Sequence, residues 1–158
     1  GSPQIVRPIR NVLLRRWGLA AGLLVACGTA PIQPLLPPNV PIHVEPEPAV
    51  FDLTAEVIER INAGLGQQAL ILGAGPGRTI WVLEEPATGC GTYDWRHEVR
   101  ISVCKGFEES EKIVLVHELG HVFGLQHSED PAAVMYAVYH QMALDDAVYS
   151  LTEALHGR

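Results

Sequence analysis

The chain has 158 residues, of which 47% are hydrophobic and 18% are charged. This balance is typical of globular proteins and excludes a chain that is disordered throughout, and the length suits a single domain with a real core. The formal net charge is −7 and three cysteines are present. An acidic domain without a basic stripe argues against nucleic acid as a partner, and three cysteines are too few for a disulfide scaffold.

The N-terminal segment has the features of an export signal. An uncharged stretch over residues 17–26 follows several arginines, and it is too short to span a membrane but long enough for a signal-peptide core. It ends in LVAC at Cys27, which resembles the lipobox of bacterial lipoproteins. That resemblance implies a signal segment over 1–27, a lipid on Cys27 and a location in the bacterial cell envelope. Gly28 after the cysteine favours the outer membrane, and an ordinary signal peptide cut near Ala30 is the alternative.

A proline-rich stretch follows the signal segment. Seven prolines fall within residues 31–48. Because proline removes backbone donors and favours an extended course, we predict a stiff tether over 28–49 with His43 in it, and a catalytic domain over 50–158. A proline-rich ligand for a partner domain is the alternative for this stretch.

Apolar spacing predicts five elements in the domain: a helix over 52–63, strands over 79–83 and 98–104, and helices over 108–123 and 144–155. Asp52 or Thr54 is expected to cap the first helix, and Gly64 and Gly66 to end it. Trp81 in the first strand is assigned to the core. The order of helix, strands and helices indicates an α+β fold.

Cys90 precedes the second predicted strand and Cys104 is its last residue. In an exported chain, Cys90 and Cys104 would form a disulfide that closes a loop of about 15 residues and contributes about 3 kcal/mol. Two separate buried thiols are the alternative.

The sequence VHELGHVFGLQH over residues 116–127 contains the residues of a metal site. His117 and His121 are four apart, so a helix places both imidazoles on one face, where they can share one ion. Gly124 can end the helix without steric cost and bring His127 in as a third nitrogen ligand. Three histidines leave a fourth position open for water, which a catalytic zinc site needs and a structural site does not.

Glu118 follows the first ligand and is not needed to bind the metal. Beside the open position, its carboxylate could take a proton from zinc-bound water, whose pKa falls to about 7, and pass it to a leaving amine. We therefore assign one zinc ion to His117, His121 and His127, and general-base catalysis to Glu118. A helix with three ordinary surface histidines is the alternative.

The segment HELGHVFGLQH resembles the zinc signature of the metzincin peptidases, and its continuation HSEDPAAVMY resembles the matrixin branch in particular. The resemblance covers about residues 113–151. It implies a minimal metzincin-like domain with a small twisted mixed sheet, an active-site helix, a methionine turn and a C-terminal helix. It also implies that Met135 lies in that turn beneath the zinc, and that Tyr139 stands beside the specificity pocket.

The leading hypothesis is a monomeric, envelope-anchored zinc endopeptidase that acts on protein or peptide substrates. The resemblance also implies an edge strand that pairs with extended substrate, and by position we expect residues 98–103 to form it. The alternatives are a zinc-binding envelope lipoprotein without catalysis and a peptidase dedicated to one partner or to itself. His140 is interpreted as a solvated side chain near the last helix.

Overall fold

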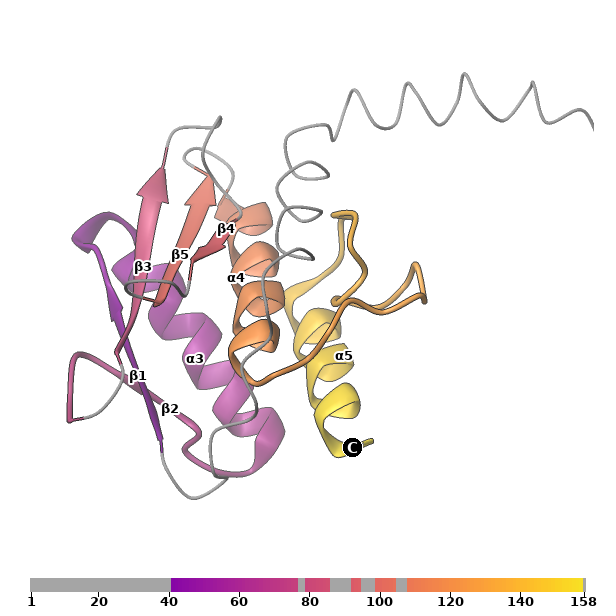
Figure 1. The fold of residues 1–158 in the computed structure, drawn as a ribbon, viewed down its shortest axis with the longest axis horizontal. Helices are drawn as coiled ribbons and strands as arrows, with labels where there is room; N and C mark the ends of the chain where they lie inside the picture. Colours follow the sequence, from indigo (N-terminus) through magenta and orange to yellow (C-terminus); the bar gives the residue numbers. More distant parts are fainter. Residues whose placement is uncertain (1–40, 77–78, 86–91, 95–98, 105–107, 158) are drawn as a thin grey trace, which may run out of the picture.

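The computed structural model describes residues 41–76, 79–85, 92–94, 99–104 and 108–157. For residues 92–94, 99–104 and 108 it describes the backbone and not the side chains. Within these residues three helices and a five-stranded sheet form the fold (Figure 1). The chain begins with β1 and a short 3₁₀ turn (Pro48–Val50), continues through α3 and the remaining strands, and ends with α4 and α5.

The sheet is mixed and has the strand order β2-β1-β3-β5-β4. Its strands are β1 (Ile42–Pro46), β2 (Leu70–Leu72), β3 (Thr79–Glu85), β4 (Thr92–Asp94) and β5 (Val99–Cys104). Every neighbouring pair is parallel except β4 with β5, which is antiparallel. β4 therefore forms one edge of the sheet. The predicted edge strand, β5, lies between β3 and β4 and so is internal where it pairs with β4. The prediction that residues 98–103 form the substrate-binding edge is wrong for that reason.

The predicted tether is wrong in its C-terminal part. Residues 42–46 form β1, which lies between β2 and β3. Ile42 and Val44 alternate inward and are buried, and Pro46 is the last residue of the strand. Pro41 and Pro46 therefore mark the ends of a strand, and the folded part begins before Val50.

The helices are α3 (Phe51–Leu65), α4 (Glu108–Val122) and α5 (Leu144–His156), close to the predicted ranges. α3 continues through Gly64 to Leu65, so the prediction that Gly64 ends it is wrong. Gly66 is the C-cap with a left-handed φ of 67°, as predicted. Its N-cap, Val50, makes no side-chain capping bond, so the predicted caps are wrong. Asp52 lies in the first turn and Thr54 is buried in the core.

The hydrophobic core lies between the sheet and the helices, which pack against one face (Figure 1). In β3, Ile80 and Val82 point into this core, while Trp81 between them is 37% exposed. The assignment of Trp81 to the core is therefore wrong, because strand alternation turns it to the opposite face.

α4 occupies the centre of the helical layer. It contacts β5, α3 and α5, and all residues from 111 to 122 are buried. A helix enclosed in this way can hold side chains in fixed positions, including polar ones. The predicted α+β fold with a mixed sheet, a central helix and a C-terminal helix is confirmed.

Two groups of predictions fall outside the described residues. The signal segment with Cys27 lies in residues 1–40, and the disulfide needs Cys90 and the side chain of Cys104, none of which the structure describes. Among the described residues, no helix is both long enough and apolar enough to cross a membrane.

Candidate metal centre

The structure brings the three predicted ligands together. The Nε2 atom of His127 lies 3.3 Å from Nε2 of His117 and 3.2 Å from Nε2 of His121. Among the described residues, these three side chains form the group that could hold a metal ion. The helical spacing of four thus has the predicted consequence for His117 and His121.

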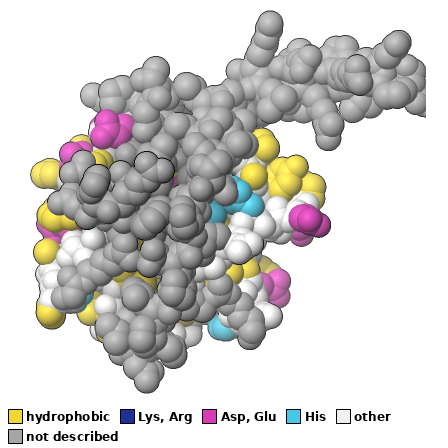
Figure 2. All heavy atoms as spheres, viewed as in Figure 1, with side chains coloured by type: hydrophobic (Ala, Val, Ile, Leu, Met, Phe, Trp, Pro, Cys, Tyr) yellow, Lys and Arg dark blue, Asp and Glu magenta, His cyan; other side chains and the backbone are white. Residues whose placement is uncertain are grey.

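His127 reaches this group because α4 ends sharply. The amide of Gly124 bonds the carbonyl of His121 and the amide of Leu125 bonds that of Gly120. Gly124 has a φ of 89°, a left-handed conformation that glycine adopts without cost. The chain therefore turns back, and His127 faces the helix as predicted. Unlike the other two, His127 is only half-buried, and Figure 2 shows histidine side chains reaching the surface beside hydrophobic ones.

Both ligands on α4 are oriented through their second ring nitrogen. Nδ1 of His117 lies 2.7 Å from the carbonyl of Val134, and Nδ1 of His121 lies 2.8 Å from the carbonyl of Leu125. Since a carbonyl only accepts, each Nδ1 carries the hydrogen and donates it. Each Nε2 therefore presents a lone pair to the centre of the group, as metal ligation requires.

The surroundings keep these imidazoles neutral. Burial, with repulsion from His121 and His127, lowers the pKa of His117 to about 3. Burial also lowers the pKa of His121 to about 4 and lowers the pKa of His127. Neutral imidazoles are the form that binds a metal, so the site needs no deprotonation near neutral pH.

The spacing of the three nitrogens fits zinc. Two nitrogens that bind one tetrahedral zinc at about 2.0–2.1 Å lie about 3.3–3.4 Å apart. The observed separations of 3.3 and 3.2 Å match this value. Without a cation, two lone pairs at such a distance would repel each other. The donor set therefore fits zinc, with an imidazole group that suits this ion.

Met135 packs against α4 next to the metal ligands. It is buried, and a Cβ placed on Gly120 would overlap its sulfur. The carbonyl of Met135 also accepts a 2.9 Å hydrogen bond from the amide of Ser128, next to His127. Met135 thus contacts the helix beside one ligand and holds the backbone beside another.

Glu118 is fully buried on α4 directly after His117. A buried carboxylate is uncommon in proteins because its desolvation is costly. Because Glu118 lies between two metal ligands of the same helix, a functional role explains its burial better than a structural role.

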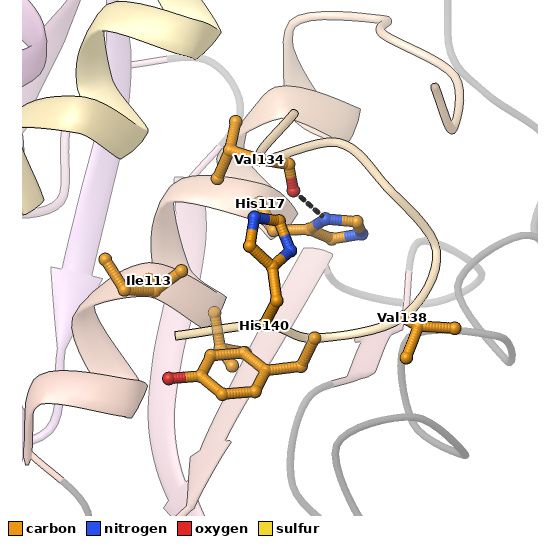
Figure 3. A pocket seen from close by; sticks show the side chains of 7 residues that line it. Ile113, His117, Val134, Val138 and His140 are labelled. Atoms are coloured by element: carbon orange, nitrogen blue, oxygen red, sulfur yellow. Dashed lines mark hydrogen bonds between the residues drawn. The ribbon is translucent and has the colours of Figure 1, made fainter. Parts of the chain in front are cut away.

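A small cavity opens beside His117 (Figure 3). Its volume is about 10 Å³, roughly the space for one water. Its lining consists of Ile113, Val114, His117, Val134, Val138, Tyr139 and His140. Tyr139 is at the cavity, as the matrixin resemblance implies, and its hydroxyl donates a 3.0 Å hydrogen bond to Ser110 Oγ on α4.

His140 is not the solvated side chain that we expected. It lines the cavity, and its Nε2 atom is buried without a hydrogen-bond partner. The sequence carries no signal for this, since nothing in the pattern around residue 140 indicates that the segment after Met135 folds back onto α4.

Ser150 on α5 is a second residue that sequence reasoning missed. Its Oγ accepts a 3.0 Å hydrogen bond from the amide of Val134, whose carbonyl accepts the hydrogen of His117 Nδ1. The backbone of one residue, Val134, thus connects the last helix to a metal ligand. Only the three-dimensional contact reveals this role, because Ser150 and Val134 are 16 residues apart.

Comparison with known proteins agrees with this geometry. Residues 82–154 match the model of the Matrixin family. Matrilysin of Felis catus is 39% identical over 66 residues, which are 41% of this chain and 25% of that protein. Matrix metalloproteinase-16 of Homo sapiens and of Rattus norvegicus is 53% identical over 34 residues, 22% of this chain and 6% of each relative. No solved structure gave a significant match.

The mixed sheet, the central helix with its convergent histidines and the methionine packed against that helix agree with this similarity. Over residues 82–154 the chain is similar to the Matrixin family. It spans a quarter or less of the length of the curated relatives that it matches.

Proposed function

We propose that this protein is a zinc-dependent endopeptidase. One zinc ion would be held by His117, His121 and His127. The proposal rests on the convergence of the three Nε2 atoms. Backbone carbonyls orient the two histidines of α4, and the same helix buries Glu118. The similarity of residues 82–154 to the Matrixin family supports the same reaction.

In this mechanism Glu118 is the general base. A zinc ion held by His117, His121 and His127 would supply Lewis acidity for the attack of water on the substrate carbonyl. Glu118 accepts the proton of the attacking water and delivers it to the leaving amine. Val134 and Leu125 keep the two ligands on α4 in the required tautomer through their carbonyls.

Substrate binding is assigned to the sheet edge at β4. This strand is antiparallel to β5 and has no described neighbour on its other side. An extended peptide could therefore add to the sheet there, through main-chain hydrogen bonds. This edge replaces residues 98–103 as the proposed substrate strand.

The setting of the enzyme remains the one that the N-terminal sequence favours. We retain the proposal that Cys27 carries a lipid, that the protein is monomeric, and that it is exported and lipid-anchored to the bacterial cell envelope. The support is the LVAC motif after an uncharged stretch. Incorporation of a labelled fatty acid by the full chain, lost in Cys27→Ala, would test the anchor.

The decisive test of the activity is cleavage of a diverse peptide pool by the zinc-loaded full chain, read by mass spectrometry. Glu118→Gln should bind zinc equally and lower the rate by about 10²–10⁴-fold. Glu111→Gln is the matched control, because Glu111 is a second buried carboxylate of α4. This control should leave the cleavage pattern intact.

If neither parent nor control cuts any peptide while both hold one zinc, the general endopeptidase proposal fails. A peptidase dedicated to one partner, or a zinc-binding lipoprotein without catalysis, would then be the better account. Cuts that persist unchanged in Glu118→Gln would show that another group is the base.

A further inference from the structure

We propose that Asn62 closes the β2 edge of the sheet to strand addition, and so keeps two copies of this chain from pairing edge to edge. The partner that this edge fits is a second copy of the chain, added as an antiparallel strand along β2. The inference is independent of the proposed function, because it concerns the edge opposite to β4 and involves neither the metal centre nor the substrate.

The strand β2 ends the sheet on the side away from β4, and it follows the end of α3 in the chain (Figure 1). A strand at an edge has unpaired backbone N–H and C=O groups, which form a template for another extended chain. Two copies of one chain present the same edge, so they can pair as antiparallel strands around a two-fold axis. A monomeric chain therefore needs this edge to be blocked.

The pairing of β2 with β1 shows which backbone groups of β2 point outward. The amide of Gly73 donates to the carbonyl of Val44 on β1, and the carbonyl of Ala69 also faces β1. Because successive residues of a strand direct their backbone groups to opposite sides, those of Leu70 and Leu72 point away from β1. These are the groups that an added strand would use.

The side chain of Asn62, in the last turn of α3, occupies the outward groups of Leu70. Its Nδ2 atom donates to the carbonyl of Leu70 at 2.9 Å, and the amide of Leu70 donates to its Oδ1 atom at 2.9 Å. A carboxamide offers a donor and an acceptor side by side, as the backbone of an extended residue does. Asn62 therefore takes the place that a residue of a neighbouring strand would take.

The groups that follow Leu72 are occupied as well. Gly73 has a φ of 104°, a left-handed conformation that turns the chain out of the strand. The amide of Ala74 then donates to a carboxylate oxygen of Glu45 at 2.6 Å. Nδ1 of His43 lies 3.2 Å from the carbonyl of Gly73 and, since a carbonyl only accepts, donates to it. Blocked positions therefore stand on both sides of Leu72.

These bonds decide how much of the edge a second copy could use. With Asn62 in place, an added strand can reach the outward backbone of Leu72 alone. Without the carboxamide, Leu70 and Leu72 open together, which about doubles the number of main-chain hydrogen bonds that two antiparallel copies can form. Asn62 is therefore the residue on which closure of this edge depends.

The test is the oligomeric state of the full chain, measured by sedimentation velocity over a range of protein concentrations. A nonionic detergent keeps the apolar stretch over residues 17–26 from associating. Asn62→Ala should form dimers with a dissociation constant about 5- to 100-fold lower than that of the parent, the range for two additional hydrogen bonds. Hydrogen exchange should show protection of residues 70–72 that rises with the concentration of the variant and not with that of the parent.

Two controls separate an opened edge from a loss of stability. Ile61→Ala, at the neighbouring residue of α3, removes a fully buried side chain and should lower stability while the chain remains as monomeric as the parent. Leu72→Pro, added to Asn62→Ala, removes the outward amide of residue 72, and proline is tolerated at a sheet edge. This double variant should return the dissociation constant close to the parental value.

A monomeric Asn62→Ala at every concentration would overturn the proposal. Equal association of Ile61→Ala, or of the double variant, would also overturn it, because lost stability would then explain the association. Protection of residues 92–94 in place of 70–72 would show pairing through β4 and contradict it too. If Asn62→Ala does not fold, Asn62→Ser, whose hydroxyl can serve one of the two backbone groups, is measured instead and should associate more strongly than the parent.

Discussion

The helices α3 and α4 have the same length of 15 residues but bury different kinds of side chain. α3 buries one face, composed of Leu53, Thr54, Val57, Ile58 and Ile61. α4 is buried all round over residues 111–122, and its buried set includes Glu111, Lys112, His117, Glu118 and His121. α3 therefore contributes apolar burial, whereas α4 carries polar groups whose desolvation opposes folding.

Stability and metal binding therefore depend on different parts of the domain. The sheet, α3 and the apolar residues of α5 offset the cost of enclosing polar side chains in α4. Lys112 illustrates the connection, because its ammonium group pairs with Glu56 of α3 at 2.8 Å, an ion pair that raises its pKa. Substitutions in α3 should therefore mainly change stability, and substitutions of the histidines in α4 should mainly change zinc binding.

The largest difference in effect is expected between a substitution at a metal ligand, which weakens zinc binding, and one at a core residue, which lowers stability. His121→Ala should weaken zinc binding by more than the roughly 10–100-fold that follows loss of a supporting hydrogen bond. Ile61→Ala on α3 should instead lower the free energy of unfolding by about 2–5 kcal/mol, because it leaves a cavity. Chelator competition and urea unfolding of both variants measure the two quantities. The comparison fails if Ile61→Ala weakens zinc binding of the folded protein as much as His121→Ala does.

Acid should destabilise the metal-free protein through the buried imidazoles of α4. In the folded state the pKa values of His117 and His121 are lowered to about 3 and 4, from about 6.5 when unfolded. Below pH 6.5 the unfolded chain binds protons that the folded chain does not, so stability falls from about pH 6.5 towards pH 4. Urea midpoints of the metal-free chain should show this fall, and it should be smaller in His121→Ala. Equal pH dependence in both proteins would contradict the assignment.

Glycine substitutions sharpen the comparison between the helices. Gly120→Ala in α4 places a Cβ against the Met135 sulfur and should cost about 1–3 kcal/mol and reduce zinc occupancy. Gly64→Ala in α3 approaches Thr152 Cγ2 at 3.0 Å, a contact that the helix propensity of alanine, about 1 kcal/mol, should largely offset. Thermal unfolding and metal analysis compare the two. Loss of zinc in Gly64→Ala alone would reverse the expected order.

The smallest effect concerns α5. Ser150→Ala removes the acceptor of the Val134 amide and should cost about 1 kcal/mol of stability, with zinc affinity falling by less than about 10-fold. Tyr149→Phe is the control, because it removes an exposed hydrogen bond to Glu153 on the same helix. Chelator competition should show a change for Ser150→Ala and none for Tyr149→Phe. Equal affinities in all three proteins would remove Ser150 from the support of His117.

The parts of the fold that sequence predicts are those with strong periodicity. The three helices were predicted within a few residues, since their apolar positions recur at helical spacing. β1 was missed because its flanking prolines conceal the alternation of Ile42 and Val44. β2 and β4 have three residues each, too few for an alternating pattern. Trp81 was misplaced because hydrophobicity alone does not tell which face of a strand is covered.

The metal ligands could be predicted because their convergence follows from local geometry. Helical spacing sets His117 and His121, and a single glycine conformation brings His127 to them. The contributions of His140 and Ser150 depend instead on how the segment after Met135 and α5 pack onto α4. Such long-range contacts have no local pattern, so the sequence could not reveal them.

The most direct test of the central claim is X-ray absorption spectroscopy of the zinc-loaded full chain. We predict one zinc per chain with three imidazole nitrogens at about 2.0–2.1 Å and one oxygen ligand, as expected for an open catalytic site. In His121→Ala the imidazole contribution should fall. A sulfur ligand, or a fourth protein nitrogen that closes the site, would contradict the account.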